Sequence, residues 1–405
     1  MSDKLPRLRG NLDFMPSPVP ERPGLLIRDP YQYSPTTLII PPALVECLRF
    51  YDGNSTGLDL HEVLYRLTSE LRTSELEQHL TEALSQAGFL ENEVYRQMRD
   101  ERHREFAASA IRESAHAGGA YSNEPDELRG TLDRYLGARE PVSSPDGLIG
   151  IAAPHVSPQG GWESYQAAYR ALGPQHAEKI FVILGTSHYG EPDRFGLTRK
   201  AFVTPLGVAA TEGALVDELA ARAPDAVMLE DYCHATEHSI EFQVVFLQHL
   251  YGPGVRIVPI LCGAFGRSLY GGGPPEDEEP VRAFLGALGE LAAREKQRLV
   301  WVLGVDMAHM GRRYGDRSPA RAGGDLMEQV AGRDRGRIDR INAGDAAGFW
   351  ELVQENHDDL KWCGSAPIYT FLKAVPEARG QLLHYQQWNI DEESVVSFAG
   401  LSFSG

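Results

Sequence analysis

Residues 298–311 read RLVWVLGVDMAHMG, an apolar run that ends at a glycine and is followed by an aspartate and, three residues later, a histidine. Two other apolar runs, GLIGIAAPH at 147–155 and KIFVILGTSH at 179–188, also end in histidine. Short apolar runs separated by longer helical patterns predict an α/β domain with a largely parallel sheet. In such sheets ligands gather beyond the carboxyl ends of the strands. The three runs therefore predict a polar site at one edge of the sheet.

The composition of the whole chain narrows the class of protein. The chain has 405 residues, 42% of them hydrophobic and 24% charged, which predicts a soluble globular protein of about two domains. No apolar run approaches the roughly 20 residues of a membrane-spanning helix, and the N-terminal segment lacks the apolar core of a secretory signal. We therefore expect a cytoplasmic protein with no membrane partner. The formal net charge of -18, without a long stripe of lysine and arginine, argues against a nucleic-acid partner.

The chain divides into three parts by composition. Residues 1–24 are polar, contain five prolines and predict an extended arm, with packing beginning at Leu25. Residues 25–105 predict a small α+β domain with a short strand pair and several amphipathic helices. Residues 110–405 predict the α/β domain. Its strands are expected at 147–153, 179–186, 255–263, 298–305 and 395–403, with helices at 164–172, 212–223, 239–251, 279–297 and 322–344.

Candidate ligands follow the strand-like runs. His155 stands behind Pro154, where the backbone leaves the sheet and a side chain can point into a crevice. His188 repeats this arrangement after the next run. Asp306 and His309 would lie on one face if DMAH formed a helical turn. A single histidine after a strand is more often a satisfied polar residue than a ligand, but three at equivalent strand ends predict a shared site.

Cysteines are the other candidates. The four cysteines are scattered and form no CxxC pair, so neither a disulfide scaffold nor a zinc ribbon is indicated. Cys363 lies in KWCGSAP, among small residues and a proline that would leave its thiol accessible. With the histidines it could bind a transition metal, or act as a nucleophile beside an imidazole. The alternative is a small buried hydrophobic residue, which is the interpretation that we keep for Cys233 and Cys262.

The segment TEHSIEFQ contains His238 and Glu241 at helical spacing. They could belong to the site. Equally, the segment could be a helix N-terminus capped by Thr236 or Ser239, with the acid stabilised by the helix dipole.

Taken in order, these segments resemble the Memo family. The resemblance covers residues 110–405 and is carried by AGGAY (117–121), APH (153–155), ILGTSH (183–188), EHSIEFQ (237–243), VPILCG (258–263), GVDMAH (304–309), CGSAPI (363–368) and VVSFAGLSF (395–403). It implies an α/β sandwich similar to the class III extradiol dioxygenases, with iron in a pocket at strand ends. It also implies that radical SAM and AMMECR1-type proteins are partners of this protein.

The resemblance also implies roles for individual residues. His155, His188 and Cys363 match the metal ligands, while Asp306 and His309 match a polar pair in the same pocket, with His309 as the acid/base. One departure is HVSPQGGWESY at 155–165, where the sequence predicts a longer loop around Trp162 on the substrate side.

Residues 25–100 resemble the winged-helix-like, PqqD-type domain of pyrroloquinoline quinone biosynthesis. The resemblance is carried by LLIRDP, YDGNSTGLDLHEVLYRL and ALSQAGFLE, and it implies recognition of a peptide or partner protein. The alternative is a domain that only caps the larger one.

The resulting hypothesis is a metal-dependent, dioxygenase-like oxidoreductase that acts on a small molecule or a peptide. Iron(II) is the expected ion, and the thiolate lets copper or zinc compete. We expect His309 to move a proton with its tautomer set by Asp306, while His238 acts from nearby with Glu241. One rival hypothesis is a non-catalytic metal- or peptide-binding partner of a radical SAM or AMMECR1-type system. The other is a metal-free cysteine hydrolase.

Overall fold

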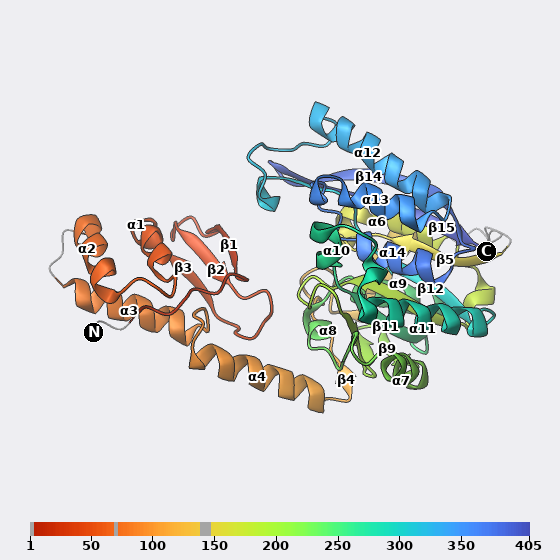
Figure 1. Cartoon of the computed structure of the whole chain (residues 1–405), viewed down its shortest axis with the longest axis horizontal. Helices are drawn as coiled ribbons and strands as arrows, with labels where there is room; N and C mark the ends of the chain where they lie inside the picture. Colours follow the sequence, from red (N-terminus) through yellow and green to blue (C-terminus); the bar gives the residue numbers. More distant parts are fainter. Residues whose placement is uncertain (1–3, 69–71, 138–146) are drawn as a thin grey trace. The chain divides into compact units, whose positions relative to one another are not determined.

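The structure, a computed structural model, describes residues 4–68, 72–137 and 147–405 (Figure 1). The chain separates into two compact units, Met1–Ala108 and Ser109–Gly405. The helices of the described part are all too short or too polar to cross a membrane.

The first unit combines a small sheet with helices. Strands β1, β2 and β3 form an antiparallel sheet in sequence order. Leucines of the helices, together with the buried Ile27, Phe89 and Leu90, form its core. Its elements are β1 (Asp13–Pro16), β2 (Leu25–Arg28), β3 (Thr37–Ile40), α1 (Pro42–Val45), the 3-10 helix η1 (Glu46–Phe50), α2 (Gly57–Thr68), α3 (Thr73–Gln86) and α4 (Glu93–Ala108).

The segment expected as an arm packs into this unit, so packing does not begin at Leu25. Residues 4–24 contain β1, which pairs with β2, and the buried side chains of Leu5 and Leu12. Arg9 is 2% exposed and makes two hydrogen bonds of 3.0 Å to the Asp29 carboxylate. The polar composition does not indicate this packing, because main-chain hydrogen bonds, a few apolar residues and one buried ion pair hold the segment.

The second unit has one large mixed sheet. Its strands are β4 (Ile111–Arg112), β5 (Leu148–Ala153), β6 (Ile180–Thr186), β7 (Phe195–Leu197), β8 (Ala201–Thr204), β9 (Gly207–Thr211), β10 (Val227–Leu229), β11 (Arg256–Cys262), β12 (Leu299–Gly304), β13 (His309–Gly311), β14 (Arg379–Asp391) and β15 (Ser394–Ser404). The main path runs β13-β15-β5-β12-β6-β11-β9-β8-β4. Strands β5, β12, β6 and β11 are parallel neighbours, and β15 pairs antiparallel with β5. The five predicted strands are β5, β6, β11, β12 and β15, which confirms the α/β class.

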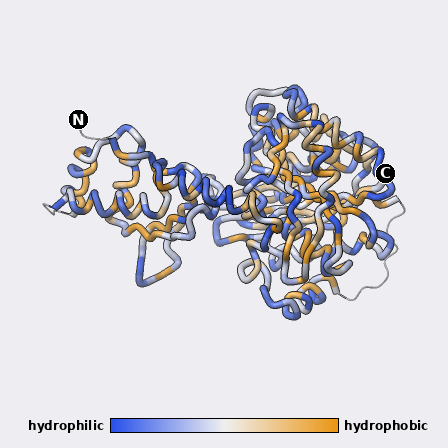
Figure 2. Tube along the Cα trace, turned by 90° about the horizontal axis from the view of Figure 1, so that it is seen from below, coloured by the Kyte–Doolittle hydropathy of each residue, from blue (hydrophilic) through white to orange (hydrophobic). Residues whose placement is uncertain are grey.

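Helices cover both faces of this sheet. Alternate residues of a strand point to opposite sides of a sheet, and here the residues on both sides are apolar. In β12, Leu299, Trp301 and Leu303 pack with α7, α11, α13 and α14 in one core, and Val300 and Val302 pack with α5, α6 and α9 in another. Figure 2 shows hydrophobic residues concentrated along the interior of this unit. The helices are α5 (Pro125–Leu136), α6 (Pro158–Tyr169), α7 (Gly213–Arg222), α8 (Cys233–Thr236), α9 (Glu241–Tyr251), α10 (Gly266–Gly271), α11 (Glu279–Glu295), α12 (Asp325–Asn342), α13 (Ala346–Gln354) and α14 (Ser365–Ala374).

Candidate metal centre

Three neighbouring strands deliver polar residues to one edge of the sheet. β5, β12 and β6 lie side by side and parallel, so their carboxyl ends meet at the same edge. The chain leaves these three strands toward His155, Asp306 and His188. The structure thus brings His155 close to both His188 and Asp306.

His155 is buried, and its tautomer is fixed by the backbone. Its Nδ1 lies 2.9 Å from the carbonyl oxygen of Gly304, which can only accept, so Nδ1 carries the proton. In the neutral ring Nε2 is therefore the nitrogen with the lone pair, and this atom lies 3.2 Å from Sγ of Cys363. The main-chain N–H of His155 donates to Oδ1 of Asp306 at 3.0 Å. The imidazole is thus preset as a ligand that points toward the thiol.

His188 is oriented by Glu237, a residue that the sequence had not singled out. Its Nδ1 lies 3.0 Å from both carboxylate oxygens, and its main-chain N–H donates to Oε2 at 3.1 Å. Oε1 of Glu237 also accepts from the main-chain N–H groups of His238 at 2.9 Å and Ser239 at 3.1 Å. Such a carboxylate–histidine pair fixes the tautomer of the neutral ring, so that Nε2 is the nitrogen that can bind a metal. The only sequence signal for Glu237 was its place directly before His238.

A third imidazole completes a triangle. The ring centroids of His155, His188 and His238 are all 5.0 Å apart, and their ligand nitrogens lie within 4.8 Å of one another. Burial and the neighbouring histidines hold the pKa of His238 well below its usual range, against the pull of Glu237. His238 is therefore a neutral imidazole with a lone pair beside the two others.

The Cys363 thiol is placed for ionisation. Burial opposes the thiolate, but the charges of His155 and His309 and hydrogen bonds from His155 and His188 outweigh it and lower the pKa to about 5. The N-terminus of α14 begins two residues later, and a helix N-terminus also stabilises a thiolate. Burial likewise opposes protonation of His155, but Cys363 and Asp306 raise its pKa to about 9. Without a metal the pair is a thiolate beside an imidazolium at neutral pH.

His309 lies near this thiol but is not held as the sequence predicted. Residues 305–308 are not helical, and His309 begins β13. Its Nδ1 lies 2.9 Å from the carbonyl oxygen of Met307 and 3.0 Å from that of Lys361, so carbonyls fix the tautomer and Nε2 is left free. The expectation that Asp306 sets this tautomer is wrong, because Asp306 accepts from the backbone of His155 instead.

A buried carboxylate connects the two loops that carry Cys363 and His309. Asp334 accepts hydrogen bonds from Nε1 of Trp362 at 2.7 Å and Oγ of Ser397 at 2.6 Å. The same hydroxyl oxygen accepts from the main-chain N–H of Ala308 at 2.9 Å. Asp334 therefore connects, directly or through Ser397, to Trp362 and Ala308, which are the residues directly before Cys363 and His309.

Glu241 belongs neither to the centre nor to a helix cap. It is fully buried, binds Arg112 and the Tyr121 hydroxyl, and accepts from the main-chain N–H groups of Ala115 at 2.9 Å and His116 at 3.0 Å. Helix α9 begins at Glu241, so the prediction of a helix N-terminus with an acid in its first turn is confirmed, but no side chain caps the helix and the cap by Thr236 or Ser239 is wrong. Glu241 instead anchors the segment 112–121 beside the centre.

The segment after His155 is shorter than predicted. Helix α6 begins at Pro158, so there is no long loop. Trp162 stacks on Tyr135 with ring centroids 6.3 Å apart and takes no part in the three-histidine cluster. A Cβ on Gly160 would come within 2.5 Å of the Trp388 ring, so glycine is needed there for close packing.

The family model and the similar curated proteins point to the same family. The family model described as Memo-like protein matches residues 112–402. A MEMO1 family protein of Aquifex aeolicus (strain VF5) is 25% identical over 382 residues, covering 93% of this chain and 95% of that protein. One of Methanopyrus kandleri is 29% identical over 307 residues, 72% of this chain and 98% of that protein. A solved structure of an uncharacterized protein from Escherichia coli K12 is similar at 12% identity with a TM-score of 0.38, over 63% of this chain and 99% of that one. The family match spans every residue of the candidate centre.

Proposed function

The chain belongs to the Memo family, and from this premise we propose that His155, His188 and Cys363 hold one iron(II) ion in a dioxygenase-like oxidoreductase. The observation that carries the proposal is the convergence of two imidazoles, each with Nδ1 committed to an acceptor, and one ionised thiol. Two histidines and one anion on one side of an iron leave positions open for oxygen and substrate. A bound iron supplies Lewis-acid and one-electron chemistry.

The spacing of the donor atoms supports this ligand set. At bond lengths typical of protein metal sites, a nitrogen and a sulfur on one ion stand about 3.1 to 3.6 Å apart. The 3.2 Å between Nε2 of His155 and Sγ of Cys363 falls in that range. A thiolate is a softer ligand than a carboxylate, so copper and zinc compete with iron for these residues.

The residues around the ion would handle protons. We propose that His309 gives or takes a proton at Nε2, because its Nδ1 is held by two carbonyls. The neutral imidazole of His238 faces the same three-histidine cluster and can act as a base or as an additional ligand. Asp306 is proposed as a positioning residue that holds the backbone of His155.

A second candidate function rests on the thiol alone. A Cys363 thiolate with a pKa of about 5, only 3.2 Å from an imidazole, has the features of a cysteine nucleophile. A metal-free cysteine hydrolase would lose its activity on alkylation and keep it in the presence of a chelator. The metal enzyme would lose its activity in both treatments.

Metal analysis tests the first proposal. The protein is reconstituted with iron(II) without oxygen, and bound metal is measured for wild type, His155→Ala, His188→Ala and Cys363→Ser. Each variant should lose most of its iron, while the exposed His357→Ala should keep it. Unchanged iron occupancy in all three variants would end the proposal. Iron binding with no oxygen uptake for any substrate would favour a non-catalytic binding protein, such as a partner of a radical SAM or AMMECR1-type system.

We also propose that the first unit recognises a peptide or partner protein. Leu58 and Tyr65 are 67% and 54% exposed and are seven residues apart on α2, which places them on one face. Replacing both with serine in the full chain should weaken binding of a candidate peptide in an anisotropy titration. An unchanged affinity would contradict a role for this face. A cytoplasmic location is part of the proposal, and the four unpaired cysteines support it.

A further inference from the structure

Helix α12 contacts the loop that carries the thiol. Residues 358–363, which we call the thiol loop, end at Cys363. Asp334 and Arg337 are three residues apart in α12, so both side chains lie on one side of that helix. Figure 1 shows α12 beside α13 and β14, on which it packs. Both residues are buried, and buried charged side chains need partners. Each of them has a partner in the thiol loop.

The two contacts hold opposite ends of the thiol loop. Nη1 of Arg337 lies 2.8 Å from Oδ1 of Asp358, the first residue of the loop. The same guanidinium lies 5.1 Å from the ring centroid of Trp362. Nε1 of Trp362, the residue before Cys363, donates to Asp334 at 2.7 Å. Removing one partner of a buried ion pair or hydrogen bond is strongly unfavourable, so these contacts restrict the loop to one conformation.

The backbone of the thiol loop needs such support. Asp358 and Lys361 have φ angles of +52° and +55°, in the left-handed region that a Cβ makes unfavourable. Residues in sparsely populated backbone conformations persist only where the surrounding structure imposes them, and they cluster at functional sites. The ion pair of Asp358 and the hydrogen bond of Trp362 lie on either side of Lys361 and impose the conformation there.

The same conformation sets the contacts of His309. Its main-chain N–H donates to the carbonyl oxygen of Leu360 at 2.9 Å, and its Nδ1 lies 3.0 Å from that of Lys361. A shift of the thiol loop would therefore move the sulfur of Cys363 and remove the acceptors of His309 at the same time.

We propose that Asp334 and Arg337 are positioning residues of the metal centre, which hold the thiol loop so that Cys363 and His155 can bind one ion. The inference rests on the proposed ligand set, in which neither residue of α12 is a ligand. Nε2 of His155 and Sγ of Cys363 are already 3.2 Å apart. A binding site must keep its ligands within about 0.5 Å of the productive geometry. Relaxation of the loop should therefore weaken metal binding without the loss of any ligand.

Cobalt(II) is the probe for the test, because a bond from a thiolate to cobalt(II) gives a charge-transfer band that reports on the sulfur. Competition with a chromophoric chelator gives the cobalt affinity of the full chain, and urea denaturation gives its stability. Asp358→Asn leaves Arg337 without its carboxylate, and asparagine tolerates the left-handed conformation as aspartate does. This variant should bind cobalt about 10-fold more weakly or worse, the loss typical of a group behind a ligand, with a weaker band at saturation.

Asp334 is tested by two substitutions. An asparagine there can accept from Trp362 with its oxygen and donate with its NH₂ group to the hydroxyls of Tyr385 and Ser397, which now donate to Asp334 at 2.7 and 2.6 Å. Asp334→Asn should therefore bind cobalt like wild type. Asp334→Ala loses all three hydrogen bonds and should weaken binding as Asp358→Asn does. If Asp334→Ala does not fold, Asp358→Asn decides the test.

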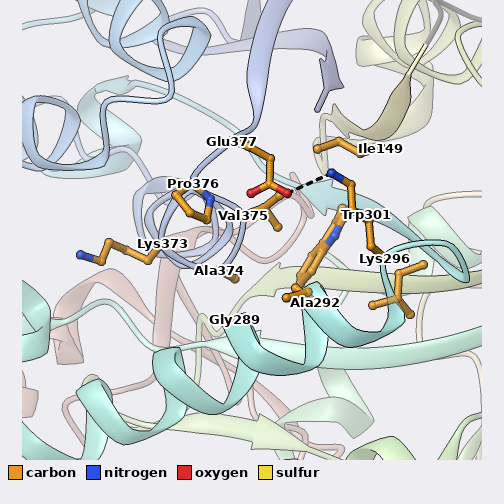
Figure 3. Close-up of a pocket in the computed structure, with 12 residues that line it drawn as sticks. Ile149, Gly289, Ala292, Lys296, Trp301, Lys373, Ala374, Val375, Pro376 and Glu377 are labelled. Carbon is orange, nitrogen blue, oxygen red and sulfur yellow. Dashed lines mark hydrogen bonds and ion pairs between the residues drawn. The ribbon is translucent and has the colours of Figure 1, made fainter.

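Three control variants remove ion pairs that do not hold the loop from within the protein. Asp29→Asn disrupts a second buried arginine pair, in the first unit, so it should lose stability and keep its cobalt affinity and band. Asp359→Asn breaks the pair with Arg333 of α12, whose side chains are 44% and 37% exposed. Glu377→Gln breaks the exposed pair with Lys296 beside the start of β12, at the end of the strand away from the centre (Figure 3). Exposed pairs contribute little, so the last two variants should bind cobalt like wild type.

The outcomes separate this inference from the ligand set on which it rests. A wild-type protein without the band, or an unchanged band in Cys363→Ser, would overturn the ligand set and the inference with it. A wild-type band together with wild-type affinity in Asp358→Asn would overturn the inference alone. An affinity loss in Asp29→Asn as large as that in Asp358→Asn would also overturn it, because lower stability and not the position of the loop would then be the cause.

Discussion

Replacing Glu237 with glutamine should weaken metal binding without removing any ligand. Both carboxylate oxygens accept hydrogen bonds from main-chain N–H groups, Oε2 from His188 and Oε1 from His238 and Ser239. A glutamine has one oxygen and one NH₂ group. In either orientation its NH₂ would face at least one main-chain N–H. The variant would also lose the negative charge that holds the Nδ1 proton of His188 and so directs Nε2 toward the metal.

The magnitude follows from these contacts. Loss of a carboxylate behind a metal-binding histidine typically weakens affinity about 10- to 100-fold, or about 1.4 to 2.8 kcal/mol. The unmatched buried N–H should lower the free energy of unfolding by about 1 to 3 kcal/mol. An anaerobic competition titration with a chromophoric chelator measures the metal affinity, and urea denaturation measures the stability.

Glu241→Gln is the matched control for Glu237→Gln. Glu241 is equally buried, but its contacts are Arg112 and the segment 115–121, not the ring of His188. This control should lose stability and keep its metal affinity. In a His188→Ala background the effect of Glu237→Gln on metal affinity should vanish. Wild-type affinity in Glu237→Gln would refute the reasoning, because it would mean that the carboxylate does not determine which nitrogen of His188 binds.

Three further predictions concern the thiol, a close contact and a buried ion pair. In metal-free protein, alkylation of Cys363 by iodoacetamide should be half-maximal near pH 5 and level above about pH 6, because the lowered pKa leaves the thiolate fully formed there; a rate still rising at pH 8 would contradict this. Gly160→Ala should lower the free energy of unfolding by about 1 to 3 kcal/mol, since the Cβ would come within 2.5 Å of an indole ring, whereas Gly336→Ala inside α12 should raise it by about 0.5 to 1 kcal/mol. Thermal melts should therefore move in opposite directions. Asp29→Ala should lower the free energy of unfolding by about 3 to 5 kcal/mol, because it leaves a buried arginine unpaired. Asp13→Ala breaks an exposed ion pair and should lower it by less than about 1 kcal/mol. Equal losses for the two variants in chemical denaturation would contradict burial as the cause.

The sequence predicts the apolar strands of the second unit more clearly than its half-buried strand β14. The five runs with continuous apolar character are the strands β5, β6, β11, β12 and β15. Strand β14 escapes such reasoning because its residues are nearly all half-buried, so RGQLLHYQQWNID shows neither a continuous apolar run nor a clean alternation. It is a strand because its backbone pairs with β15 along almost its full length. Pairing of this kind is a tertiary contact that local pattern does not report.

In the candidate site, the sequence predicts where the residues lie but not which hydrogen bonds they make. The sequence places His155, His188 and Asp306 at strand ends, and parallel strands then require those ends to meet. It does not say which acceptor each imidazole faces. Glu237 meets His188 across 49 residues, and the carbonyl of Lys361 meets His309 across 52. Such contacts depend on how loops cross the sheet edge, and for that reason the role expected of Asp306 was wrong while its position was right.

The charge balance of the centre links its metal-free and metal-bound forms. The buried Asp306 and the Cys363 thiolate place negative charge at one edge of the sheet. In the metal-free protein this charge is balanced by protons on the imidazoles, since the pKa of His155 rises to about 9 and that of His188 lies well above its usual range. A divalent ion bound to the same nitrogens would have to displace those protons. The thiol has none to give at neutral pH, because its pKa is about 5. A bound divalent ion would therefore replace the two imidazole protons at two of its three proposed donor atoms, and this exchange would leave the net charge of the centre unchanged.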